Sequence, residues 1–201
     1  MRRFVILGQR TRGSPAFSLT DLAGSSGRLD VLLRCVRAAL LVSHGVRRDT
    51  IVYLALLGDP DAPRSLRIDG ATARFVRPDE RSLAVLVQKT LAVPPLRDAD
   101  FAEVRPGIAS AAGGLECVLA DLAPGTRYVL EEGAPDIREG SLDVRDPIFF
   151  VGDHLGFDPH ARARIDALGA TPVGLGPVSL HAEDAVAVVS NEVDRRTASR
   201  A

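Results

Sequence analysis

Residues 51–57, Ile-Val-Tyr-Leu-Ala-Leu-Leu, form an apolar run without polar alternation. A strand of this kind is buried on both faces, as the central strands of parallel sheets are. Other apolar runs alternate along the chain with helix-like segments, which favours an α/β fold with a mostly parallel sheet flanked by helices. The further predicted strands are 4–7, 127–131, 148–151 and 171–175, and the predicted helices are 28–44, 78–92, 115–122, 158–169 and 182–196.

Two regions give weaker signals. Residues 66–68 and 73–76 are short apolar runs on either side of Asp69 and Gly70, which predicts a β-hairpin. Residues 11–27 are rich in Gly, Ser and Pro and indicate a loop, whereas 91–112 carry no clear pattern.

The composition of the chain argues against several classes of function. The chain has 201 residues, is 46% hydrophobic and has a net charge of −1, which argues against nucleic-acid binding over its whole surface but leaves a local basic patch possible. No apolar run approaches the roughly 20 residues of a membrane span. The apolar stretch 4–7 is shorter than the roughly 7–15 residues of a signal peptide. We therefore expect a cytoplasmic protein, with Cys35 and Cys117 as buried free thiols. The four histidines show no metal-ligand spacing, and we expect no metal.

Three strands in the last third end in glycine-bearing loops, at 131–135, 152–156 and 175–180. Ligands bind at the carboxyl ends of strands in open parallel sheets, so these loops could form a pocket walled largely by backbone. They could equally be plain turns. No dinucleotide fingerprint and no phosphate-binding P-loop motif occurs in the chain.

The loop sequences Val151-Gly-Asp-His-Leu-Gly156 and Leu175-Gly-Pro-Val-Ser-Leu-His181 resemble the cofactor loops of the SPOUT superfamily of S-adenosylmethionine-dependent RNA methyltransferases. Within it, the chain resembles the TrmY family of archaeal tRNA pseudouridine N1-methyltransferases. The stretch Gly24-Ser-Ser-Gly-Arg-Leu-Asp-Val-Leu-Leu-Arg-Cys-Val36 is similar to the N-terminal motif of that family. Other similar stretches are 41–49, 78–81, 106–108 and 190–195, so that the resemblance spans nearly the whole chain.

This resemblance implies a single SPOUT methyltransferase domain over residues 1–201, with an N-terminal half at 1–110 and a knotted, cofactor-binding half at 111–201. The implied fold is an α/β knot with a C-terminal deep trefoil knot. The implied activity is N1-methylation of pseudouridine 54 in the T loop of tRNA by a homodimer. The cofactor residues carried over are Leu130, Gly152, Leu175, Gly176, Pro177, Val178, Ser179, Leu180 and Ala185. Family members usually have Cys where this chain has Ala185.

N1 of neutral pseudouridine carries a proton, which a carboxylate or an oriented water could remove during methyl transfer. Candidate proton acceptors are Asp153, Asp30 and Asp49, with Asp79 and Asp194 behind them, and no spacing singles one out. His154 and His181 flank the cofactor loops, where each could orient a loop or act as a base. The candidates for RNA contact are Arg28, Arg34, Arg47, Arg48 and Arg81, each of which could instead pair with a carboxylate.

Two other functions remain open at this point. One is a SPOUT methyltransferase acting on another RNA, either a base or a ribose of rRNA. The other is a non-catalytic knotted RNA-binding protein, for which Ala185 is the supporting feature.

Overall fold

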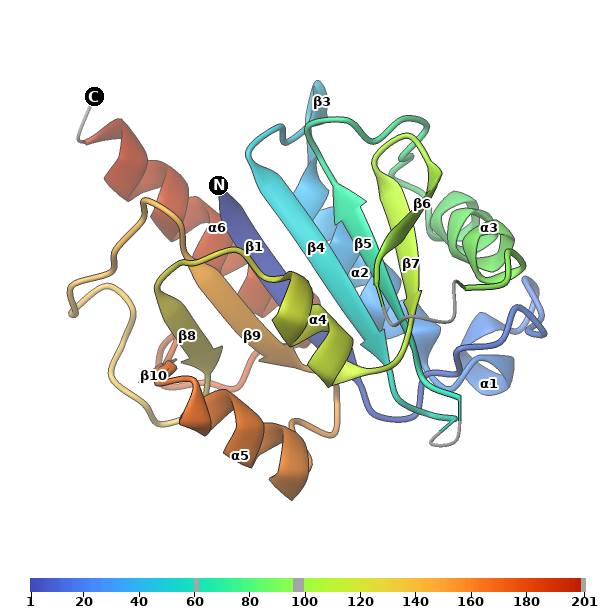
Figure 1. Cartoon of the computed structure of the whole chain (residues 1–201). Helices are drawn as coiled ribbons and strands as arrows, with labels where there is room; N and C mark the ends of the chain where they lie inside the picture. The colour runs from blue at the N-terminus through green and yellow to red at the C-terminus, as the bar shows by residue number, and fades with distance from the viewer. Residues whose placement is uncertain (60–61, 96–99, 200–201) are drawn as a thin grey trace.

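The computed structural model describes residues 1–59, 62–95 and 100–199. Within them lies an eight-stranded sheet of order β10-β8-β9-β1-β4-β5-β7-β6 (Figure 1). Its strands are β1 Arg2–Gly8, β4 Thr50–Leu56, β5 Arg64–Asp69, β6 Ala102–Arg105, β7 Ile108–Ala112, β8 Arg127–Leu130, β9 Ile148–Gly152 and β10 Thr171–Val173. A separate hairpin is formed by β2 Leu41–Val42 and β3 Gly45–Val46.

The sheet has a parallel half and an antiparallel half. Strands β10, β8, β9, β1 and β4 all run in one direction, whereas β5, β7 and β6 pair antiparallel. The predicted central strand at 51–57 is confirmed as β4, between β1 and β5. The α/β class with a mostly parallel sheet is confirmed as well.

Helices cover both faces of the sheet. They are α1 Leu22–Ser25, α2 Leu29–Leu40, α3 Glu80–Leu91, α4 Leu115–Asp121, α5 Pro159–Ala167 and α6 Ala182–Ala198. Successive side chains of a strand point to opposite faces. Accordingly Phe4 and Ile6 of β1 join the core under α2, α3 and α6, and Val5 and Leu7 join the core under α4 and α5 (Figure 1).

Local signals explain where several helices begin. Asp79 caps α3 by accepting a hydrogen bond from the amide of Ser82, as predicted. Asp158 caps α5, and Pro159 occupies its first position, also as predicted. The expected buried free thiols are present: Cys35 and Cys117 are both buried and unpaired.

Three predicted elements are wrong. The helix predicted at 28–44 ends at Leu40, because the chain turns back through the β2–β3 hairpin and Arg47 donates its amide to the Leu40 carbonyl. The hairpin predicted at 66–76 does not form, since β4 and β7 occupy both edges of β5. The unassigned region 91–112 contains the hairpin β6–β7, and the predicted loop 11–27 contains the short helix α1.

Among the described residues, no helix is both long and apolar enough to span a membrane. The same part of the chain holds no cluster of three or more side chains that could bind a metal ion.

Candidate functional site

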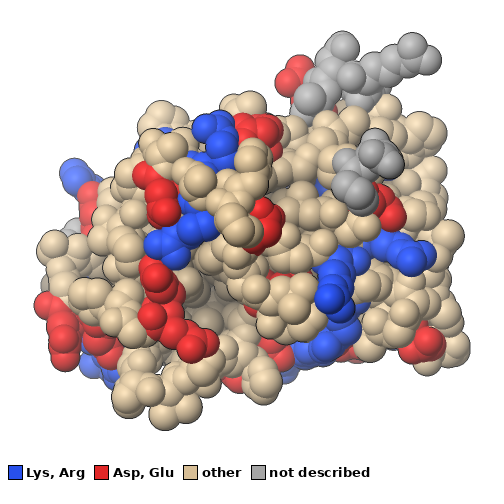
Figure 2. All heavy atoms as spheres, turned by 90° about the horizontal axis from the view of Figure 1, so that it is seen from below, with Lys and Arg blue, Asp and Glu red and all other residues tan. Residues whose placement is uncertain are grey.

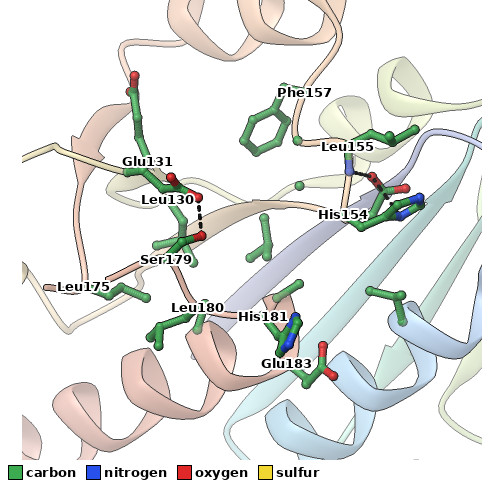
Figure 3. A pocket seen from close by; sticks show the side chains of 18 of the residues that line it. Leu130, Glu131, His154, Leu155, Phe157, Leu175, Ser179, Leu180, His181 and Glu183 are labelled. Atoms are coloured by element: carbon green, nitrogen blue, oxygen red, sulfur yellow. Dashed lines mark hydrogen bonds and ion pairs between the residues drawn. The ribbon is translucent and has the colours of Figure 1, made fainter. Parts of the chain in front are cut away.

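The three glycine-bearing loops that follow β8, β9 and β10 meet around one cavity of about 1000 Å³. It opens at the end of the molecule where the parallel strands terminate, and Figure 2 shows it as a hollow with acidic and basic side chains at its rim. Figure 3 shows Phe157 and Leu155 on one side, and Leu175, Leu180 and His181 on the other. A cavity of this size, at this edge of a parallel sheet, is typical of a small-molecule site.

Much of the cavity wall is backbone. Gly152 ends β9, and a Cβ atom on it would lie 2.7 Å from the backbone of Gly156, so only glycine allows this close approach. In the loop between β10 and α6, the amides of Leu175, Gly176 and Ser179 make no hydrogen bond to any described residue. Leu175 and Gly176 are half-buried and Ser179 is exposed, and all three line the cavity, so these amides are open to a ligand that enters it.

The apolar part of the wall comes from several elements. Leu130 ends β8, Val173 ends β10, and Ala185 lies in the first turns of α6 with 8% of its surface exposed. Val178 is 72% exposed and Leu155 is 48% exposed, although both line the cavity. Apolar side chains left open at a cavity mouth are suited to covering a flat ring of a ligand or substrate.

The carboxylates that line the cavity already have partners. Glu132 accepts a hydrogen bond of 2.5 Å from Ser179 Oγ, which links the loop after β8 to the loop after β10. Glu131 pairs with Arg162 of α5 at 2.8 Å. Glu183 pairs with Arg34 at 2.7 Å. These contacts tie the three walls of the cavity together.

Asp153 serves the architecture of the loop after β9. Its side chain is buried, and its two oxygens accept hydrogen bonds from the amides of Gln9 and Leu155, each at 2.8 Å. His154 Nδ1 lies 3.8 Å from Asp153 Oδ1. Since both carboxylate oxygens are engaged by backbone, Asp153 holds the end of β1 against the loop after β9.

A buried carboxylate stands behind two arginines of the cavity wall. Asp30 accepts hydrogen bonds from Arg28 Nε at 3.0 Å, Arg28 Nη2 at 3.1 Å and Arg34 Nη1 at 3.0 Å. Burial alone would raise the pKa of Asp30, but the hydrogen bonds from the two arginines outweigh it and lower that pKa. Arg28 itself stands at the N-cap position of α2 and has a left-handed backbone with φ of 70°.

The structure sorts the predicted site residues into two groups. All nine predicted cofactor residues line the cavity, together with Arg28, Arg34, Asp153, His154 and His181. Asp30 lies directly behind the cavity wall. The remaining candidates are elsewhere.

The structure does not bring Asp49, Arg47 or Arg48 to the cavity. Asp49 and Asp194 both bind Arg2 at 2.7 Å, and Arg47 also binds Asp194 at 2.7 Å. The Arg48 guanidinium donates to the carbonyls of residues 70 and 71. These groups hold the start of β1 to α6 and the loop after β5. Arg81 lies in α3 and Asp79 caps that helix, and neither lines the cavity.

Sequence reasoning missed the ion pair of Arg162 with Glu131 and the hydrogen bond of Ser179 to Glu132. The two glutamates lie in a loop that was expected to line the pocket, so their position carried a signal. No sequence pattern pointed to Arg162, because it reaches the cavity only through the position of α5, from which it pairs with Glu131.

The fold and the cavity define an α/β protein with a small-molecule site at the carboxyl edge of its parallel strands. Comparison with known families is more specific. Residues 1–198 match the family described as putative SAM-dependent RNA methyltransferase, and the chain belongs to that family.

Curated relatives support the match along the whole chain. A Methanosarcina mazei protein named tRNA (pseudouridine(54)-N(1))-methyltransferase is 40% identical over 202 residues, covering 100% of this chain and 94% of its own length. A Methanocaldococcus jannaschii protein of the same name is 33% identical over 202 residues, covering 98% of each chain. Among solved structures, Archaeoglobus fulgidus Nep1 bound to S-adenosylhomocysteine has a TM-score of 0.65 at 16% identity, covering 98% of this chain and 99% of its own. That structural likeness shows a shared fold.

Proposed function

We propose that this protein is a tRNA methyltransferase that uses S-adenosylmethionine to methylate N1 of pseudouridine 54 in the T loop. The observation that carries the proposal is the backbone-walled cavity, which all nine residues expected from the family resemblance line together. Membership of an S-adenosylmethionine-dependent RNA methyltransferase family supports the cofactor, and the names of the full-length relatives support the target.

The residues present fit the cofactor. Amides of Leu175, Gly176 and Ser179 lack partners in the described structure and would bind the adenine edge or the methionyl group. Leu130 and Ala185 supply apolar walls, and the small side chain at 185 leaves the cavity open. Bound there, S-adenosylmethionine supplies an electrophilic methyl group on a sulfonium, so that positioning of the nucleophile provides most of the acceleration.

We assign the N1 proton of pseudouridine to His154. The carboxylates of the cavity wall are engaged by arginines, by Ser179 or by backbone amides. His154 lines the cavity with 32% of its side chain exposed, and its Nδ1 lies 3.8 Å from Asp153 Oδ1, a contact that His181 lacks. When N1 gains the methyl group, its N–H bond would break and the proton would pass to an imidazole nitrogen of His154.

A transfer assay tests the function. The protein is incubated with S-adenosylmethionine carrying a labelled methyl group and with T-loop RNAs that contain either uridine or pseudouridine at the target position. We expect transfer to the pseudouridine RNA. Transfer to the uridine RNA alone would contradict the specificity, and loss of methyl groups only from rRNA in a deletion strain would favour an rRNA target. Absence of binding heat with either the cofactor or its demethylated product would favour a non-catalytic protein.

Four further features implied by the resemblance are part of this proposal: one domain over residues 1–201, a C-terminal trefoil knot, a homodimer and a cytoplasmic location. The knot is supported by the way α6 lies against the long β8–β9 connection, where Arg196 donates to the carbonyls of Ile137, Arg138 and Gly140. The apolar surface of α2 is buried inside the chain against α6, so the dimer rests on the family resemblance. Light scattering that gives twice 21.4 kDa would support it.

A further inference from the structure

A second, smaller groove of about 340 Å³ lies on α3, away from the cavity. Its wall comes from three segments: the loop after β5, one face of α3 and the end of β6. The side chains that matter here are Phe75, Arg77, Arg81, Val85, Lys89 and Arg105. The groove is therefore basic, with one large aromatic ring at its edge.

Phe75 is held in solvent by its backbone. It is 82% exposed and has φ of 63°, a left-handed conformation that is rare for a bulky residue. The loop before it is fixed by Ala73, which is buried and donates its amide to the Asp69 carbonyl. Gly107 packs so tightly on Ala73 that a Cβ atom would approach it within 2.2 Å. An aromatic ring fixed in an exposed position is a platform for stacking.

Three cations of the groove lack counter-ions. Within residues 1–59, 62–95 and 100–199, the side chains of Arg81, Lys89 and Arg105 make no ion pair and no hydrogen bond, whereas the charge of Arg77 acts on the nearby Asp79 carboxylate. The Nε–H of Arg105 is buried without a partner. Arginines at the large cavity are, in contrast, bound to carboxylates. Unpaired cations in one groove call for an anionic partner.

The cations also follow a line. Arg81 and Lys89 are eight positions apart on α3, with Val85 midway between them, so all three project from one face over about 12 Å. An aromatic ring beside a row of basic side chains is the arrangement that binds unpaired nucleotides, by stacking a base and tracking the phosphates.

We propose that the α3 groove binds unpaired RNA nucleotides, with a base stacked on Phe75 and phosphates held by Arg81 and Lys89. The inference rests on the proposed function in taking the RNA to be the tRNA substrate. The groove lies at the edge of the sheet where β5 ends and β4 begins, whereas the cavity lies where the parallel strands end. The two sites have no lining residue in common, although Glu80 at the start of α3 pairs with Arg34 of the cavity wall at 3.5 Å. The groove therefore binds nucleotides other than the one that is methylated.

The chain contains no Trp, so Phe75→Trp introduces a single fluorescent reporter at the stacking position. We expect its fluorescence to be quenched when the full-length tRNA transcript is added. Val42→Trp, at an exposed position in β2, serves as the matched control and should not respond. An unquenched Phe75→Trp signal at RNA concentrations that saturate binding by anisotropy would overturn the proposal.

Charge and stacking are tested separately by anisotropy with labelled tRNA. Phe75→Ala should weaken binding at least fivefold, since stacking contributes about 1–3 kcal/mol per base. The pair Arg81→Ala and Lys89→Ala should lower the salt slope by about 1.4, or about 0.7 for each lost phosphate contact. Arg145→Ala with Arg164→Ala removes two exposed cations that pair with carboxylates elsewhere, and should leave the slope unchanged. Equal slopes for the two double variants would overturn the proposal.

Methylation kinetics separate this inference from the proposed function. With saturating tRNA, Phe75→Ala should keep the wild-type kcat and raise KM. If RNA binds the groove but no methyl group is transferred, the proposed function fails and the groove stands. If methylation proceeds with an unchanged KM in both Phe75→Ala and the Arg81/Lys89 double variant, the groove proposal fails and the function stands. If Phe75→Ala changes the oligomeric state of the protein but not its RNA affinity, the groove is a contact with a second copy of the chain, and the RNA proposal is overturned.

Discussion

Asp30 links the stability of this protein to the wall of its cavity, and Asp30→Asn tests that link. The side chain is 7% exposed and receives three hydrogen bonds from Arg28 and Arg34. The amide retains one acceptor oxygen but directs an NH₂ group at a guanidinium. A hydrogen bond to a charged group contributes about 1.5–3 kcal/mol, and the partial exposure of both arginines reduces this. We expect Asp30→Asn to lower the free energy of unfolding by about 2 kcal/mol.

The dependence on pH follows from the direction of the pKa shift. The pKa of Asp30 is lower in the folded protein than its ordinary value of 3.8. The ionised carboxylate therefore stabilises the fold fully above pH 3.8, and this contribution is lost as pH falls through the lower, folded pKa. The gap in stability between the wild type and Asp30→Asn should stay constant from pH 7 to about 5. It should close only at more acidic pH.

Urea unfolding followed by circular dichroism at a series of pH values measures this gap. In thermal unfolding at pH 7, the Tm of Asp30→Asn should be about 4–8 °C below that of the wild type. Asp184→Asn is the matched control, because Asp184 is exposed in the first turn of α6 and forms no ion pair with a described residue. Equal stability of Asp30→Asn and wild type at pH 7 would refute the reasoning. So would a gap that closes between pH 7 and 5, since that requires a raised pKa.

Three further outcomes are expected. Cys35 and Cys117 should resist a thiol reagent in the native protein and react only in denaturant, because burial raises the pKa of both thiols; a colorimetric thiol assay checks this. Gly152→Ala should abolish cofactor binding in calorimetry, since its Cβ atom would lie 2.7 Å from the facing backbone. His154→Gln should lower kcat by about 100-fold with an unchanged cofactor Kd, whereas His181→Gln should leave kcat near the wild-type value.

The sequence predicts the parts of this structure that local patterns determine. The buried strand β4 and the caps Asp79 and Asp158 follow from residue type and order. For the glycine-bearing loops after β8, β9 and β10, the same patterns left a shared pocket and plain turns equally open. The end of α2 does not follow from them, because apolar residues at 41 and 42 suit a helix and a strand equally. Contacts such as Arg34 with Glu183 join residues 149 positions apart, and only the packing of α2 against α6 brings them together.

The two candidate sites differ in how their charges are balanced, and this bears on their ligands. At the cavity, cations and carboxylates pair internally, which suits a small ligand that carries both signs of charge. In the α3 groove, Arg81 and Lys89 remain unpaired within the described residues, which suits a polyanion. A net charge of −1 hides this difference because it sums over both. The affinity for RNA should therefore fall as salt rises, more steeply the more groove cations are present. The affinity for the small ligand of the cavity should change little with salt. Parallel salt titrations of the two ligands measure that contrast.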